Sequence, residues 1–279
     1  MIIDFHAHTT ASDGTLTPAQ LIEEMGKKSI TYFSITDHDT IDGVKSVKHI
    51  PQGSTFINGV EISAEFPKTL HILGYGFDAQ HEELNASLNQ LQEFRKNRNT
   101  KMLEKMDNMG FKISMEELIS EAGSDLVGRP HFANLMLRKD YVSSYQEAFD
   151  KYLKKGAPLY LDKKRFDPDK AIELIHKAGG IAVMAHPYQT KLEGEALENL
   201  VKELVSYGLD GIEVFYSQHT PEQVQQYKAF AIKYDLLTTA GSDFHGANKP
   251  EISLGMSVAE EELTDFLSYV KEKASDFNE

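Results

Sequence analysis

The sequence predicts an α/β fold built around a mostly parallel sheet. Short apolar runs alternate with helical patterns of about 10–15 residues, which is the rhythm of repeated strand–helix units. About seven such runs are present, enough for a closed or an incomplete barrel. The middle of the chain breaks the rhythm, because it shows helical periodicity and no strand-like alternation.

Local signals place each element in chain order. Thr17 and Pro18 form a helix-capping pair and predict a helix that runs to about Lys28. Apolar runs bounded by polar residues predict the strands, which are Ile2–Phe5, Thr31–Ile35, Ser54–Ile62, Leu70–Tyr75, Gly180–Ala185, Gly211–Phe215 and Leu236–Ala240.

The middle of the chain is predicted to be helical. One long amphipathic helix is indicated by apolar residues that recur every three or four positions: Leu84, Leu88, Leu91, Phe94, Met102, Met106 and Met109. Shorter helices are predicted at Met115–Ala122, His131–Arg138 and Tyr145–Leu153. We interpret this part as a helical insertion within the α/β domain.

The composition excludes several classes of protein. With 29 basic and 43 acidic residues the net charge is −14, which argues against duplex DNA as a partner. The chain has no cysteine, which excludes disulfides and thiolate zinc sites. No apolar run approaches the roughly 20 residues of a membrane span. Because the first residues also lack the basic start of a signal peptide, we expect a cytoplasmic protein with no membrane partner.

Histidines and acids gather where the predicted strands end. His6 and His8 flank one residue, so both side chains point to the same side. His71 begins its strand and must come from an antiparallel neighbour or a longer loop, whereas the others lie at carboxyl ends, where barrels build active sites. The set contains six of the eleven histidines and three carboxylates: His6, His8, His38, His71, His186, His245, Asp13, Glu61 and Asp243.

Each of these residues has an ordinary explanation when taken alone. Asp37 or Asp39 could cap a helix that begins near Thr40, Glu61 could form a salt bridge, and His186 could be a buried histidine at a turn. Their conjunction favours a metal site, because gathering so many polar groups is costly unless a cation lies among them.

Together these residues resemble the polymerase and histidinol phosphatase (PHP) family of metal-dependent phosphoesterases. The matching segments are His6-Ala7-His8, Asp13-Gly14, Thr36-Asp37-His38, Glu61, His71, Ala185-His186-Pro187 and Ser242-Asp243-Phe244-His245. The resemblance implies a distorted (β/α)7 barrel with a trinuclear metal centre at the strand ends. The barrel would comprise residues 1–80 and 156–279, and residues 81–155 would form a small inserted helical domain.

The resemblance also implies a role for each ligand. His6, His8, Glu61 and Asp243 would hold the first ion. Glu61 would bridge to a second ion, shared with His71 and His186. The third ion would lie between Asp13, His38 and His245, and some relatives carry histidine at the position of Asp13.

Such a ligand set suits the hydrolysis of a phosphate monoester. Two divalent ions about 3.5–4 Å apart can activate a bridging hydroxide for in-line attack and neutralise the phosphoryl group. Imidazole and carboxylate ligands suit zinc, manganese and iron alike, so the sequence leaves open the identity of the two or three ions. Their charge would make a cationic pocket within an acidic protein.

The insertion carries four of the five arginines, and two of its segments are candidate phosphate-binding sites. In Gly128-Arg129-Pro130-His131 the proline marks a helix start, which would aim Arg129, His131 and backbone N–H groups at an anion. Arg95 and Arg98 share one face of the long helix. Ordinary solvated helix surfaces remain the alternative for both segments.

The segment around Arg129 resembles one subgroup of the family, which hydrolyses nucleoside 3',5'-bisphosphates and removes 5'-nucleotides from short RNA. That resemblance implies that Arg129 and His131 bind the phosphate that is not cleaved. We therefore predict a phosphoesterase for a small anionic substrate, a nucleotide or the 5' end of a short RNA. The alternatives are a histidinol-phosphate-type phosphatase, an amidohydrolase, and a metal-binding regulatory protein without turnover.

Overall fold

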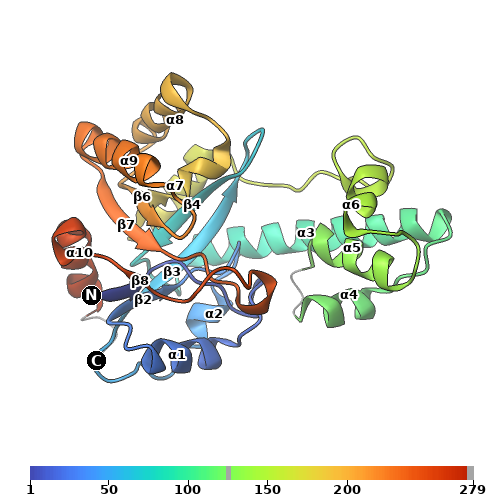
Figure 1. Ribbon diagram of the computed structural model, residues 1–279, viewed down its shortest axis with the longest axis horizontal. Helices are drawn as coiled ribbons and strands as arrows, with labels where there is room; N and C mark the ends of the chain where they lie inside the picture. The colour runs from blue at the N-terminus through green and yellow to red at the C-terminus, as the bar shows by residue number, and fades with distance from the viewer. Residues whose placement is uncertain (124–126, 275–279) are drawn as a thin grey trace. The chain divides into compact units, whose positions relative to one another are not determined.

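The computed structural model describes residues 1–123 and 127–274 (Figure 1). The chain forms two compact units. The first combines Met1–Leu88 with Arg165–Glu279 and carries the sheet, and the second is Asn89–Lys164.

Within the described residues the first unit contains one sheet of eight strands, in the order β7-β6-β5-β4-β3-β2-β1-β8. The strands are β1 (Ile2–Asp4), β2 (Tyr32–Ile35), β3 (Thr55–Ala64), β4 (Leu70–Tyr75), β5 (Ile181–Met184), β6 (Gly211–Tyr216), β7 (Leu237–Gly241) and β8 (Met256–Ser257). The first seven correspond to the predicted strands. The sequence analysis missed β8, since two residues are too few to show a pattern.

Most neighbouring strands are parallel, as predicted, and β4 is the main exception. It runs antiparallel to both β3 and β5. Residues 65–69 alone connect β3 to β4, which is too short for a parallel crossover. The expectation that His71 comes from an antiparallel strand is therefore confirmed, and the same pairing extends β3 beyond its predicted end to Ala64.

Hydrogen bonds just beyond β1 and β7 nearly close the sheet into a barrel. Phe5 N–H donates to Ala240 O at 3.1 Å, Asp243 N–H donates to His6 O at 2.7 Å, and Ala7 forms a parallel bridge with Phe244. The predicted fold class, a distorted barrel of strand–helix units, is confirmed. β8 adds an antiparallel edge beside β1.

Helices cover the sheet of the first unit. They are α1 (Pro18–Lys27), α2 (Asp42–Lys45), α7 (Pro168–Lys177), α8 (Gly194–Ser206), α9 (Pro221–Tyr234) and α10 (Thr264–Ala274). The predicted helix start at Thr17 is observed, and Thr17 and Gln20 form a reciprocal capping box. A single turn of 3₁₀ helix, Pro187–Thr190, follows β5.

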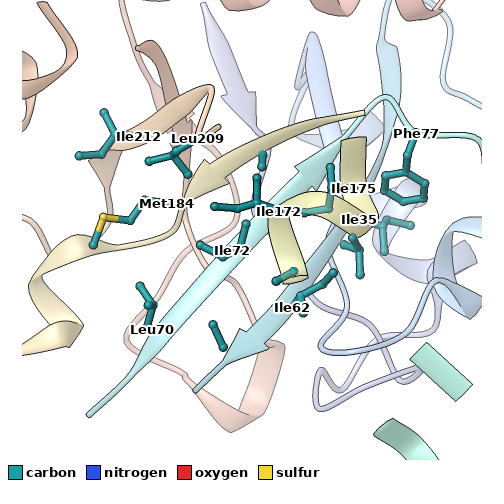
Figure 2. Close-up of a cluster of buried hydrophobic side chains, with 14 of the residues drawn as sticks. Ile35, Ile62, Leu70, Ile72, Phe77, Ile172, Ile175, Met184, Leu209 and Ile212 are labelled. Carbon is teal, nitrogen blue, oxygen red and sulfur yellow. The ribbon is translucent and has the colours of Figure 1, made fainter. Parts of the chain in front are cut away.

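The strands of the barrel bury both faces. Outside, Ile62 and Ile72 of β3 and β4 pack with Ile172 and Ile175 of α7 (Figure 2). Inside, Leu73 of β4 belongs to a second apolar cluster, because successive strand residues point to opposite faces. Burial on both sides explains why the strands read as continuous apolar runs.

The inner apolar cluster fills one end of the barrel interior. The ring of Phe266 from α10 lies edge-on to Phe5 and Tyr75, with centroid distances of 4.8 and 5.3 Å. Glu61 and His71 follow the same alternation as Ile57 and Leu73 and therefore also face inward. The interior is thus apolar beside α10 and polar at the carboxyl ends of most strands.

The second unit is helical and has its own core. The long helix α3 (Glu82–Asn108) begins in the first unit and ends in the second, where α4 (Met115–Ala122), α5 (Arg129–Arg138), α6 (Tyr145–Ala148) and the π-helical turn Phe149–Leu153 follow. Met102 and Met106 of the predicted stripe are buried in this core. Phe94 is exposed, because the two ends of α3 belong to different cores and the stripe is not continuous, and Met109 is exposed just beyond the end of the helix.

No helix among the described residues combines the length and apolarity that a membrane span requires.

Candidate metal centre

All nine residues predicted at the strand ends lie together in the first unit. The loops after β1, β2, β5 and β7 carry six of them, β3 and β4 carry Glu61 and His71, and Asp13 lies in the loop before α1. β6 carries none of the nine. Six of them are fully buried or nearly so: His6, His8, Glu61, His186, Asp243 and His245. The side chains of Asp13, His38 and His71 are partly exposed.

Glu61 is at the middle of the cluster. Its Oε1 atom lies 2.7 Å from His71 Nδ1 and 2.8 Å from His186 Nε2. Its Oε2 atom lies 2.9 Å from His38 Nδ1 and 3.3 Å from the Nε2 atoms of both His6 and His8. The carboxylate therefore faces five imidazoles, shared between its two oxygens.

The potential ligand atoms fall into three overlapping groups, within each of which all the atoms lie within 4.8 Å of one another. Asp243, in the loop after β7, contacts a histidine in the loop after β1, because its Oδ1 atom lies 3.2 Å from His8 Nε2. The groups are His6, His8, Glu61 and Asp243; His8, Asp13, His38 and His245; and His38, Glu61 and His71.

The donor atoms of this cluster fit a bound cation. Several buried atoms that face one another make no hydrogen bond: His6 Nε2, His8 Nε2, His38 Nδ1 and Glu61 Oε2. Buried polar atoms are nearly always hydrogen-bonded, so a group of unsatisfied ones requires an explanation. Imidazole nitrogen and carboxylate oxygen are ligands of zinc and related divalent ions, and cations held by the three groups would satisfy these atoms.

Electrostatics favour charged carboxylates in the cluster. Burial raises the pKa of Glu61, but His38, His71 and His6 together hold it well below its usual range. Burial lowers the pKa of His71 to about 4, assisted by nearby imidazoles, which leaves this ring neutral and able to bind a metal. Burial also lowers the pKa of His8, but the nearby carboxylates of Asp243 and Glu61 outweigh it and raise the pKa to about 9.

Two buried aspartates hold the loops that carry the cluster. Asp4 accepts hydrogen bonds from Ser242 N–H at 2.9 Å and Gly255 N–H at 2.8 Å, which fixes the loop after β7. Asp37 accepts from Thr9 N–H at 2.8 Å and from Ser12 Oγ at 2.6 Å, which fixes the loop after β1. The ordinary capping role considered for Asp37 is therefore not the one observed.

The backbone is strained beside the cluster. His186 has φ of +24° and Asp243 has φ of +61°, values that cost non-glycine residues about 1–3 kcal/mol each. At Gly241 the constraint is one of space, since a Cβ atom at this position would lie only 2.2 Å from His6 Cβ. Such local strain persists only where the surrounding structure fixes the conformation.

The sequence analysis missed two residues that hold Asp243. Tyr216 Oη donates to Asp243 Oδ2 at 2.8 Å, and Lys249 Nζ lies 2.7 Å from the same oxygen. These contacts leave Oδ1 directed toward the histidines. Neither residue belongs to a motif, and only the fold brings them to the strand ends.

Glu213 is a further residue that the sequence analysis missed. It is fully buried in β6 and accepts a hydrogen bond from His6 Nδ1 at 2.9 Å. A lone acid inside the apolar strand Gly211–Tyr216 is a signal that could have identified it, because a charge is rarely buried without a partner.

The four predicted phosphate-binding residues lie in the second unit. α5 begins at Arg129, two residues before the predicted start at His131, and Pro130 lies in its first turn. Arg129 NH1 donates to Leu153 O at 3.2 Å, and the guanidinium lies 5.2 Å from the ring centre of Tyr160. His131 Nδ1 accepts from Gly128 N–H at 2.9 Å, so this imidazole caps its own helix.

Arg95 and Arg98 lie on α3, and both side chains are half-buried. Arg98 donates to Asn99 Oδ1 at 2.8 Å, and Asn99 in turn donates to Val127 O at 2.9 Å. These contacts tie the arginine to the core of the second unit. Among the described residues, none of the three groups of potential metal ligands includes any of these four residues.

Comparison with known proteins places this site in a family. The chain is 32% identical over 245 residues to a 5'-3' exoribonuclease of Haemophilus influenzae, covering 87% of this chain and 89% of the relative. It is 30% identical to a 3',5'-nucleoside bisphosphate phosphatase of Chromobacterium violaceum, covering 87% of both chains. A phosphoribosyl 1,2-cyclic phosphate 1,2-diphosphodiesterase of Eggerthella lenta is also 30% identical, with 88% and 95% covered. No family model matches the chain.

Solved structures give the same result for the fold. A metal-dependent phosphoesterase from Bifidobacterium adolescentis superposes with a TM-score of 0.79 at 27% identity, over 97% of this chain and 95% of that one. A protein from Chromobacterium violaceum, described as an amidohydrolase and solved with sulfate and without metal, superposes with a TM-score of 0.81 at 26% identity, over 97% and 96%.

The barrel, the cluster of histidines and carboxylates, and these relatives define a metal-dependent hydrolase that acts on phosphate esters. The chain belongs to the PHP family of phosphoesterases. The family predicted from the strand-end residues is thereby confirmed.

Proposed function

We propose that this phosphoesterase hydrolyses a nucleotide, such as a nucleoside 3',5'-bisphosphate, or acts on the 5' end of a short RNA. The observation that carries the metal-dependent reaction is the group of buried nitrogen and oxygen atoms around Glu61 that have no hydrogen-bond partner and could bind metal ions. The substrates named for the relatives from Haemophilus influenzae and Chromobacterium violaceum support the nucleotide class.

The proposed ligand set comprises all nine strand-end residues and two or three ions of zinc, manganese or iron. His6, His8, Glu61 and Asp243 would hold the first ion, and their mutual approach supports this group. Glu61 Oε1, which contacts both His71 and His186, would contribute to the second. The third would lie among Asp13, His38 and His245, where His245 Nε2 is 3.2 Å from Asp13 Oδ1.

Divalent ions in this position supply charge neutralisation at the phosphoryl group and lower the pKa of water. The protein's own residues hold the ligands in place. Glu61 offers one oxygen to each side of the cluster, and Tyr216 and Lys249 direct Asp243 toward it. Lys249, one-third exposed, adds a positive charge beside Asp243, which would favour the binding of an anionic substrate.

The helical insertion, residues 81–155, is proposed to contribute to substrate binding through Arg129, His131, Arg95 and Arg98. Arg129 begins α5, where backbone N–H groups and the helix dipole favour an anion. Its guanidinium is partly buried against Tyr160, which reduces the entropy lost when it binds a phosphate. The phosphate bound here would be the one that is not cleaved.

The test is an assay of purified protein with added Mn²⁺ against three substrates. Adenosine 3',5'-bisphosphate is expected to be hydrolysed with a higher kcat/KM than p-nitrophenyl phosphate or histidinol phosphate. Preference for histidinol phosphate would instead establish the alternative phosphatase. No hydrolysis of any of the three by protein with measured bound manganese would overturn the proposal and leave a metal-binding protein without turnover.

A further inference from the structure

We propose that Glu213 is a positioning residue of the metal centre, which holds two metal ligands at once from a strand that carries none. Its Oε1 accepts a hydrogen bond from the His6 ring at 2.9 Å, and its Oε2 accepts from His186 N–H at 2.7 Å. The inference rests on the metal centre proposed above. It adds to the site a residue outside the nine, on the same strand, β6, that carries Tyr216.

The contact with His6 sets the direction of that imidazole. Nδ1 is bound by Glu213, so the opposite ring nitrogen, Nε2, lies 3.3 Å from Glu61 Oε2 and 3.6 Å from Asp243 Oδ1. A carboxylate that binds one ring nitrogen of a histidine fixes the ring and increases the basicity of the other nitrogen. This places the unsatisfied Nε2 atom of His6 toward the cluster.

The contact with His186 acts on the backbone. His186 has φ of +24° and precedes Pro187, so its conformation needs support from its surroundings. The N–H bond to Glu213 provides this support at the residue itself. With the backbone held, the His186 ring reaches Glu61 Oε1 at 2.8 Å.

The location of Glu213 also supports a role in the metal centre. Ile212 and Val214 belong to the outer apolar core, so Glu213 between them faces the barrel interior. Its side chain is fully buried, a costly position for a carboxylate. Both of its oxygens are bonded to residues proposed as ligands, one on each side of Glu61.

The experiment compares Mn²⁺ binding by wild-type protein and Glu213→Gln, using electron paramagnetic resonance of free Mn²⁺. Glutamine keeps the shape but replaces one acceptor oxygen by an NH₂ donor, so it cannot accept from both N–H groups. Loss of a residue that supports metal ligands typically weakens metal binding by about 10–100-fold. We expect a loss of this size in Mn²⁺ affinity, with kcat restored at saturating Mn²⁺.

Asp210→Asn is the matched control. Asp210 Oδ2 also accepts from a histidine ring, His176 Nε2 at 2.7 Å, and from a backbone N–H, that of Ala182 at 2.7 Å. Neither partner is a proposed ligand. We expect Mn²⁺ affinity to be unchanged in this variant, and an equal loss in both variants would overturn the role of Glu213.

The outcomes separate this inference from the proposed function. Absence of Mn²⁺ binding by the wild-type protein would overturn the metal centre itself. Normal Mn²⁺ affinity in folded Glu213→Gln would overturn only the role of Glu213. If Glu213→Gln does not fold, Glu213→Asp carries the same prediction, because its shorter side chain cannot reach both groups. Failure of both variants to fold would show that Glu213 acts on the whole fold, contrary to the proposal.

Discussion

Polar side chains are satisfied in different ways in the barrel and in the helical insertion. In the barrel, buried nitrogen and oxygen atoms of His6, His8, His38 and Glu61 face one another without hydrogen bonds. In the insertion, Arg129 bonds to a backbone carbonyl and His131 caps its own helix. The difference indicates that the barrel is built to hold a cation, whereas the insertion is stable through its own contacts.

Charge pairs differ in the same way. Ion pairs of the insertion, such as Lys151 with Glu147 at 2.6 Å, lie at the surface, where each contributes little to stability. In the barrel, Glu61 has no exposed surface and contacts five imidazoles. Substitutions in the cluster should therefore affect metal binding and catalysis together, and those in the insertion should affect substrate preference.

The largest effect is expected from Glu61→Ala. Because Glu61 contacts five of the other proposed ligands, we expect hydrolysis of p-nitrophenyl phosphate in Mn²⁺ to fall by about 100-fold or more. Glu65→Ala, an exposed residue just beyond the same strand, is the control and should retain activity. Retained activity and manganese content in Glu61→Ala would contradict the central role of this carboxylate.

A second prediction contrasts a glycine from each region. In Gly241→Ala the new Cβ would lie 2.2 Å from His6 Cβ, and we expect a loss of stability of about 1–3 kcal/mol together with weaker Mn²⁺ binding. In Gly128→Ala the new Cβ meets Pro130 Cδ at an ordinary 3.4 Å, and we expect a loss below about 1 kcal/mol. Urea unfolding measures both. Equal losses of stability in the two variants would show that the close approach of Gly241 to His6 does not exclude a side chain at position 241.

Arg129→Ala tests the role of the insertion. If Arg129 binds the phosphate that is not cleaved, kcat/KM for adenosine 3',5'-bisphosphate should fall about tenfold or more, since a charge-assisted hydrogen bond contributes about 1.5–3 kcal/mol. Hydrolysis of p-nitrophenyl phosphate, which has no second phosphate, should be unchanged. Arg138→Ala, on the same helix and paired with Glu121, is the control. An equal loss on both substrates would remove the proposed role of Arg129.

The smallest effect is a pH dependence confined to the insertion. Hydrogen bonds from Lys151 and Ser143 lower the pKa of Glu147 to about 2. A lowered carboxyl pKa contributes stability above the unfolded value near 4.3, and this contribution is lost as the pH falls toward 2. Carbon-detected NMR of Glu147 should show titration near pH 2 at low salt. A midpoint near 4.3 would exclude the interaction.

Much of the fold and the residues of the cluster could be predicted from the sequence. Seven strands followed from apolar runs, and His6, His8 and His38 were found because histidines at strand ends are unusual. Glu213 stands out in the sequence only as a lone acid in an apolar strand, which does not reveal its partners, and Lys249 shows no local signal. Each forms its important contact with a residue of another strand or loop, so its meaning depends on the register of the folded barrel rather than on its neighbours in sequence.

The insertion shows where sequence patterns are less informative. The helix α5 was predicted to within two residues of its observed start at Arg129, because proline acts locally on the backbone. The capping bond of His131 was not predicted, since a histidine near a helix start can face either its own backbone or an external anion. Periodicity likewise predicted one stripe on α3, although the helix belongs to two cores.

The seam between the ends of β1 and β7 has a consequence for how the enzyme is made. His6 and Asp243 meet across this seam although they lie far apart in the sequence. During synthesis His6 must therefore wait until β7 and the loop that follows it have been made before this partner exists. A chain interrupted before β7 would lack Asp243 and His245. Ions bound across the seam would act as a cross-link between β1 and β7.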